Sequence, residues 1–121
     1  MQILIITIVL ICHFIGDFVL QTNEMAQNKS KSNKVLTSHV RMYIAPFLFM
    51  AICFPIAIHG LGSIYFLIVN FIMHWVIDHT SSRVTSYYWE KKKIHAFFVT
   101  IGADQLIHAL TLLITIQLFL V

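Results

Sequence analysis

Charged side chains are scarce in this sequence. Only 11% of its 121 residues are Asp, Glu, Lys or Arg, whereas 59% are hydrophobic, and the mean hydropathy is +0.83. Soluble domains carry about a quarter charged residues, so this scarcity excludes a soluble globular domain. About four apolar stretches of about 20 residues, each long enough to span a bilayer, account for the chain. We therefore predict a single integral membrane domain over residues 1–121.

Several common motifs are also missing. Cys12 and Cys53 fall in apolar stretches without Cys-x-x-Cys spacing, which excludes a disulfide framework and a zinc ribbon and predicts that both pack against other helices. No basic residue precedes the first apolar stretch and no small-residue cleavage site follows it, so we expect a retained helix rather than a signal peptide. No GxxxG motif marks a helix-pairing face. A homodimer is nevertheless an option, because four short helices around a polar centre bury little surface.

Hydropathy and turn signals predict an all-α, four-helix transmembrane bundle made of two helical hairpins. The helices are expected at about residues 3–20, 35–58, 63–89 and 94–121. The polar stretch 22–34 is too hydrophilic to span and predicts a loop with a short surface helix. His59-Gly60-Leu61-Gly62 predicts a tight turn. Pro46 and Pro55 predict bends in the second helix, because proline removes a backbone hydrogen bond.

The basic residues are confined to two stretches. All eight Lys and Arg lie between Lys29 and Arg41 or between Arg83 and Lys93. With four spans these stretches share one side of the membrane, and the positive-inside rule places that side in the cytoplasm. We expect an inner-membrane protein with both termini outside and with membrane lipids, not nucleic acid, as partners. Lys29, Arg41 and Arg83 are expected to bind anionic lipid headgroups.

Ionisable residues interrupt the apolar stretches at regular spacing. Three pairs of one histidine and one aspartate are four residues apart: His13 and Asp17, His74 and Asp78, and Asp104 and His108. Residues four apart project from one helical face. If the chain turns back near Lys91, the second and third pairs meet at matching depth. Counted from the outer helix ends, the three aspartates lie about 25 Å deep, in one plane near the cytoplasmic edge.

Seven side chains are therefore predicted to converge as metal ligands. They are His13, Asp17, His39, His74, Asp78, Asp104 and His108. An ionisable group in a membrane span costs several kcal/mol unless it is paired, hydrated or metal-bound, so a set of this size indicates a working site. Imidazole and carboxylate without thiolate suit zinc first, with iron, manganese or nickel as alternatives, and seven donors allow one or two ions.

Other polar residues on these helices fall into two sets. Three could orient the ligands or, equally well, join helices by hydrogen bonds: Gln21, Asn70 and Gln105. Three histidines lie off the polar stripes or outside their depth, and we assign them to packing or to the interface: His59, His79 and His95.

Several ordered motifs resemble a known family. They are His13-Phe-Ile-Gly-Asp17-Phe-Val-Leu-Gln21, Met25-Ala26, Lys29, His39, His74-x-x-Ile-Asp78 and Asp104-Gln105-x-x-His108. Over nearly the whole chain they resemble the bacterial and phage membrane proteins grouped as domain of unknown function 3307. The family name assigns no activity, so the resemblance supports the residues and not a reaction. A looser similarity to small membrane-bound proteins described as metal-dependent hydrolases favours hydrolysis.

The depth of the site favours lipid chemistry. A metal one or two turns below the headgroups can reach a lipid ester, so we expect a metal-dependent hydrolase acting on a lipid or lipid-linked (phospho)ester at the cytoplasmic leaflet. A metal-activated water would attack, with Asp17, Asp78 or Asp104 as general base. The alternatives are transport of a divalent metal or protons, and a non-enzymatic phage-type membrane effector. The outer half of each helix is almost wholly apolar, which opposes transport.

Overall fold

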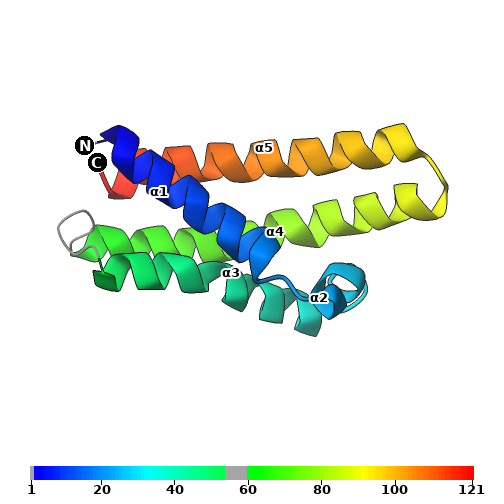
Figure 1. The fold of residues 1–121 in the computed structure, drawn as a ribbon, viewed down its shortest axis with the longest axis horizontal. Helices are drawn as coiled ribbons and strands as arrows, with labels where there is room; N and C mark the ends of the chain where they lie inside the picture. Colours follow the sequence, from blue (N-terminus) through cyan, green and yellow to red (C-terminus); the bar gives the residue numbers. More distant parts are fainter. Residues whose placement is uncertain (1, 54–59) are drawn as a thin grey trace.

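The structure, a computed structural model, describes residues 2–53 and 60–121, and these residues form the predicted all-α bundle. The elements are α1 (Gln2–Phe14), a π-helical turn η1 (Ile15–Val19), α2 (Asn23–Asn28), α3 (Asn33–Cys53), α4 (Leu61–Glu90) and α5 (Ile94–Phe119). Four helices, with η1 continuing α1, are long and apolar enough to cross a membrane. Both termini lie at one end of the bundle, and α2 and the α4–α5 turn lie toward the other (Figure 1).

The polar connection after the first long helix contains the predicted short helix. α2 begins after Thr22, whose Oγ1 accepts a hydrogen bond from Met25 N at 3.2 Å. Such a bond satisfies one of the free N–H groups at a helix start. α3 begins at Asn33, about two residues earlier than predicted, and Ser32 Oγ accepts a bond from Val35 N at 3.4 Å in the same way.

α4 begins at Leu61, about two residues earlier than predicted. Gly60 has a φ of +77°, a left-handed conformation that favours glycine. Leu61 and Gly62 already belong to α4, so their predicted place in the turn is wrong. The predictions made for Pro55 and His59 fall outside the described residues.

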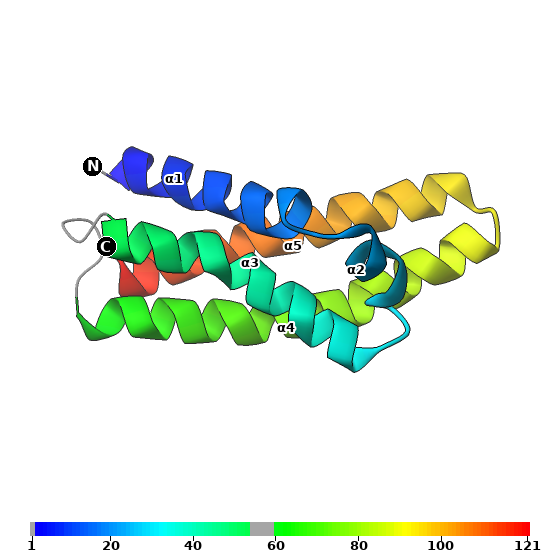
Figure 2. The ribbon, with the colours of Figure 1, turned by 60° about the horizontal axis from the view of Figure 1, so that its bottom comes forward.

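The α4–α5 hairpin is the longest unit of the fold. α4 has 30 residues, which corresponds to about 45 Å, whereas the hydrocarbon core of a bilayer is about 30 Å thick. The hairpin closes through Lys91 to Lys93, with Lys92 at a φ of 55°. From a second angle the hairpin again extends beyond α2 (Figure 2). The closed end of the hairpin therefore extends farther from the termini than α2 does.

A glycine allows the first and third helices to touch. A Cβ atom at Gly16 would lie 2.5 Å from the carbonyl oxygen of Tyr43 and 2.9 Å from its Cα, well inside contact distance. Gly16 lies in η1, and such single π-helical turns are frequent at functional sites. The close approach brings Asp17, the next residue, against α3.

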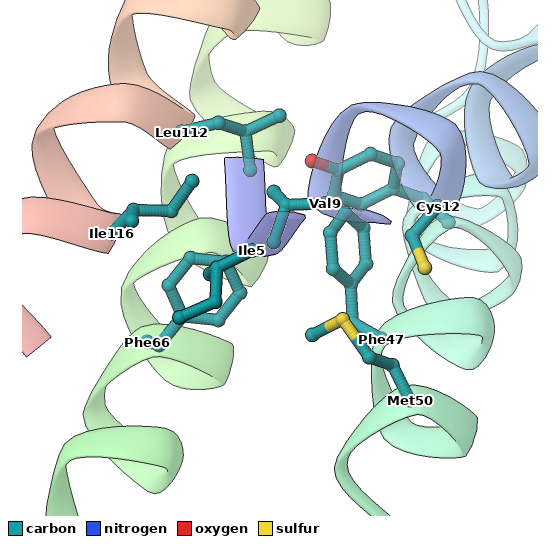
Figure 3. Close-up of a cluster of buried hydrophobic side chains, with 9 residues drawn as sticks. Ile5, Val9, Cys12, Phe47, Met50, Phe66, Leu112 and Ile116 are labelled. Carbon is teal, nitrogen blue, oxygen red and sulfur yellow. The ribbon is translucent and has the colours of Figure 1, made fainter. Parts of the chain in front are cut away.

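The apolar core fills the half of the bundle toward the termini. Every long helix contributes buried side chains to it, and Figure 3 labels eight of them: Ile5, Val9, Cys12, Phe47, Met50, Phe66, Leu112 and Ile116. The thiol of Cys12 lies 3.7 Å from the carbonyl oxygen of Pro46, inside α3, so Cys12 packs as predicted. Cys53 is exposed, and its predicted packing is wrong. The buried side chains beyond this core are mostly polar.

Candidate metal centre

Four buried side chains from three elements converge at the middle of the bundle. They are Asp17 of η1, His39 of α3, and His74 and Asp78 of α4. We call them the four-donor group, because each offers one ligand atom and these atoms all lie within 4.8 Å of one another. His39 has no exposed surface, and none of the other three is more than 4% exposed. The four side chains of the group are thus almost completely buried.

Five of the six distances among these four ligand atoms are close to those around a tetrahedral ion. Nε2 of His39 lies 3.1 Å from Asp17 Oδ1, 3.2 Å from Asp78 Oδ2 and 3.3 Å from His74 Nε2. Nε2 of His74 lies 3.5 Å from Asp17 Oδ1 and 3.6 Å from Asp78 Oδ2. A tetrahedral Zn²⁺ with bonds of about 2.0–2.1 Å separates its ligands by about 3.3–3.4 Å. The five distances scatter around that value.

The two facing imidazole nitrogens lie close to more polar groups than hydrogen bonds from one ring nitrogen can use. A ring nitrogen offers one proton or one lone pair, yet His39 Nε2 is within 3.4 Å of two carboxylates, a second imidazole and an ammonium group. A cation shared by the four ligand atoms would use all of their lone pairs at once. The residues present therefore fit a divalent metal.

A second set of donors adjoins the first. Asp17, Asp104 and His108 also place one ligand atom each within 4.8 Å of the others, and we call them the three-donor group. His108 Nε2 lies 3.0 Å from Asp78 Oδ1 and 3.4 Å from Asp104 Oδ1. The hairpin therefore brings the second and third His/Asp pairs together, as their spacing predicts. Asp17 belongs to both groups and joins them.

His13 is the one predicted ligand that lies outside both groups. Its Nε2 faces Gln105 Oε1 at 3.2 Å. The amide nitrogen of Gln105 donates to Asp17 Oδ2 at 3.1 Å and to Asp104 Oδ2 at 3.0 Å. Gln105 thus holds both carboxylates, and His13 in turn contacts Gln105.

The other two amides differ from Gln105. Asn70 donates to Phe66 O at 2.8 Å and to Thr115 Oγ1 at 2.9 Å, so it joins α4 to α5, which is the second of the two predicted roles. Gln21 Oε1 is buried and has no hydrogen-bond partner among the described residues. Neither His79 nor His95 belongs to a donor group of the described chain, in line with their assignment.

Sequence reasoning missed two neighbours of the site. Lys29 Nζ, just after α2, lies 2.7 Å from Asp78 Oδ2 and 3.4 Å from His39 Nε2. Tyr43 stacks on the imidazole of His74, with ring centroids 3.7 Å apart. Tyr43 is four residues after His39, so its place on the same helical face was a usable signal. For Lys29, the one signal that it belongs to the site was its place among the motifs that resemble the family.

The three residues predicted to bind headgroups have different surroundings. The ammonium of Lys29 is paired with Asp78, as described above. Arg83 donates to His79 O at 2.6 Å and to Asn33 Oδ1 at 2.8 Å, which ties α4 to the start of α3. Arg41 is exposed on α3.

With the donor groups placed, the chain can be compared with known proteins. A family model described as protein of unknown function (DUF3307) matches residues 5–121. The chain belongs to the DUF3307 family. No curated protein and no solved structure shows a match. The match covers all seven predicted ligands and confirms the family-level interpretation of the sequence.

A cavity in this DUF3307 chain leads away from the donors. It measures about 530 Å³, lies between α2, α4 and α5, and is called here the α4–α5 cavity. Asp17, Asp104 and Gln105 form part of its lining, as do the exposed Gln27 and Trp89 nearer the surface. Asp17 and Asp104 of the three-donor group therefore border a space that a small molecule could enter, whereas the imidazoles of His39, His74 and His108 are not among its lining residues.

Proposed function

We propose that this protein is an integral membrane metalloenzyme that hydrolyses an ester or phosphoester of a lipid or lipid-linked substrate at the cytoplasmic leaflet. One observation carries the proposal. Four buried donor atoms lie at tetrahedral spacing, and beside them a three-donor group borders the α4–α5 cavity.

The distribution of charge supports the membrane orientation. Both basic stretches belong to the end of the bundle opposite the termini, and the positive-inside rule places that end in the cytoplasm. The large apolar side chains that the fold leaves exposed lie on all four long helices and would face lipid. The donor groups then lie below the cytoplasmic headgroups, with the end of the α4–α5 hairpin projecting past them.

The two donor groups suit different tasks. Structural zinc sites have four protein ligands, whereas catalytic sites have three and keep a position free for water. The four-donor group fits an anchoring ion. The three-donor group of Asp17, Asp104 and His108 fits an ion with a free position on the cavity side. Zinc is the first choice, and iron, manganese or nickel suit the same donors.

The residues around the cavity can carry out hydrolysis. A bound divalent ion supplies a water acidic enough to act as a nucleophile at neutral pH. Asp104 has a side chain 15% exposed, and the carboxylate oxygen that does not bind the ion would take the proton of that water. Hydrolysis would join the water oxygen to the ester carbon or phosphorus, break the ester bond and transfer the proton to the departing alcohol. Gln105 holds the Asp104 carboxylate in place for this transfer.

Transport is less well supported. A metal or proton crossing the bilayer would have to pass from the donor groups to the end that holds the termini. In the described residues that route is filled by the apolar core, where Val9, Phe47 and Phe66 are at most 1% exposed. Asn70 and Thr115 are polar there, but they bond to each other.

The first test is metal content, measured by inductively coupled plasma mass spectrometry on detergent-purified protein. Wild type should hold one or two equivalents of a divalent metal, and His39→Ala and Asp78→Asn should lose the equivalent held by the four-donor group. His95→Ala removes an exposed imidazole outside both groups and should keep it. Folded wild-type protein with no metal above background would overturn the proposal.

The second test is turnover. Metal-loaded protein in liposomes of mixed lipids is assayed for released fatty acid and phosphate. Asp104→Asn should abolish release while retaining metal at the four-donor group, which does not include Asp104. Loaded wild type that releases neither product would refute hydrolysis and leave a membrane effector as the better account.

A further inference from the structure

The α4–α5 cavity has one apolar and one polar wall. Phe97 and Ile101 of α5 and Trp89 of α4 contribute apolar surface, and the rings of Trp89 and Phe97 lie 5.0 Å apart. Hydroxyl groups from α4 and from the segment after α2 form another part of the lining, called here the hydroxyl wall: Ser30, Ser81, Ser82, Thr85 and Ser86. Ser86 Oγ donates to Ser30 Oγ at 2.9 Å, and Thr85 Oγ1 donates to the carbonyl oxygen of Ser81 at 2.7 Å. A single cavity with both kinds of surface suits an amphiphile.

Two polar atoms in this lining lack a partner. Gln21 Oε1 and Ser82 Oγ are both buried, and neither has a hydrogen-bond partner within residues 2–53 and 60–121. An unpaired buried polar atom is costly, so both atoms need a bonding group from a ligand or a water molecule. Gln21 Oε1 can only accept a hydrogen bond, which requires a donor such as a hydroxyl.

The charge of the cavity argues against an anionic headgroup. A divalent ion in the three-donor group would offset Asp17 and Asp104, which leaves Glu90 as the other carboxylate of the described lining, beside two ammonium groups, Lys29 and Lys31. One of these ammonium groups, that of Lys29, is already paired with Asp78 at 2.7 Å. A phosphate seated along the hydroxyl wall would therefore meet little free positive charge.

Size and position complete the argument. The volume of about 530 Å³ falls within the range of about 300–1,000 Å³ that small-molecule sites occupy. The cavity lies between α2 and the part of the α4–α5 hairpin that faces it, and α2 lies on the side of the bundle away from the termini (Figure 1). In the proposed orientation that part is level with the lipid headgroups, so a headgroup needs no deep insertion to enter.

We propose that the α4–α5 cavity binds the uncharged, hydroxylated headgroup of a lipid, such as a glycosyl or polyol group, with its hydroxyls on the serine and threonine wall and its carbon face on Trp89. This inference rests on the proposed function, because it names the class of substrate that the donor groups would act on. Gln21 and Ser82 select the headgroup, and the three-donor group lies at the inner end of the same space.

The test measures lipid retention by native mass spectrometry in an amine oxide detergent, because a glycosidic detergent would compete. The probes are monoglucosyl diacylglycerol and phosphatidic acid with identical acyl chains, offered to wild type, Ser82→Ala, Gln21→Leu and Ser63→Ala. Ser63 is the matched control, since its Oγ is also buried and unpaired in the described structure but does not line the cavity. All proteins are checked for thermal unfolding and metal content.

Wild type and Ser63→Ala should retain one equivalent of the glucosyl lipid in preference to phosphatidic acid. Ser82→Ala and Gln21→Leu should each bind it about threefold to tenfold more weakly, the effect of one lost hydrogen bond, with unchanged metal content. The inference would be overturned if wild type preferred phosphatidic acid or retained neither lipid. It would also be overturned if Ser63→Ala and Ser82→Ala weakened binding of the glucosyl lipid equally. Because metal is measured separately, a protein that holds metal but not glucosyl lipid refutes only this inference, and the reverse result refutes only the metalloenzyme.

Discussion

Gly16 links the packing of the helices to the geometry of the donors, and its replacement by alanine should weaken metal binding. The added Cβ would lie 2.5 Å from the carbonyl oxygen of Tyr43, whereas ordinary contact begins at 3.4 Å. Both atoms belong to backbone, so η1 must move away from α3 by about 0.9 Å. Asp17 and His39 are on opposite sides of that contact and now lie 3.1 Å apart.

The size of the effect follows from the tolerance of metal coordination. Ligand distances in metal sites stay within about ±0.2 Å of their usual values, so a shift several times larger removes Asp17 as a ligand. Second-sphere changes alone cost about 10–100-fold in metal affinity, and loss of a ligand should cost at least as much. Overpacking should also lower the free energy of unfolding by about 1–3 kcal/mol.

The assay is competition for Zn²⁺ against a chromogenic chelator, with unfolding followed in the same detergent. Gly102→Ala is the control, because a Cβ at Gly102 meets nothing within 4 Å although this glycine is only two residues from Asp104. It should bind Zn²⁺ normally and be up to about 1 kcal/mol more stable, since alanine favours helix. Folded Gly16→Ala with wild-type affinity would refute the coupling of packing to the site.

Three further predictions concern single side chains. Lys29→Met should tighten Zn²⁺ binding in the chelator assay, because its ammonium now competes for Asp78 Oδ2 at 2.7 Å; weaker binding would instead make Lys29 a supporting partner of the site. His13→Gln should keep full metal content by mass spectrometry, because its ring lies outside both donor groups, and metal loss would add His13 to the ligands. Phe47→Ala should lower the free energy of unfolding by about 3–5 kcal/mol in a reversible denaturation assay, whereas Phe49→Ala, at a position 67% exposed, should have little effect.

The fold was largely predictable because each helix is long and apolar. Turns were the weak point: Leu61 and Gly62 were placed in a turn on composition, yet they extend α4. A glycine indicates a turn only where the backbone adopts a left-handed conformation. Among the described glycines, Gly60 alone has a positive φ. The π-helical turn at Gly16 left no hydropathy signal, because it depends on the close approach of α3.

The helical period determined most of the candidate site from sequence alone. A polar residue in an apolar span is costly, so the polar positions are few, and a four-residue spacing puts each His/Asp pair on one face. Because the chain turns back between them, His74 and His108 lie at the same depth along the bundle. In the structure their rings stack, with centroids 4.2 Å apart.

The tertiary structure alone decided which donors share an ion and what lies beside them. The contact of Lys29 with Asp78 joins residues 49 apart in sequence through a connection that has no helical period to constrain it. The α4–α5 cavity likewise depends on tertiary packing, because it lies between α2, which packs on α3, and the α4–α5 hairpin. His13 has the same spacing as the other histidines, but the way α1 packs against α5 sets its ring on Gln105 instead of among the ligands.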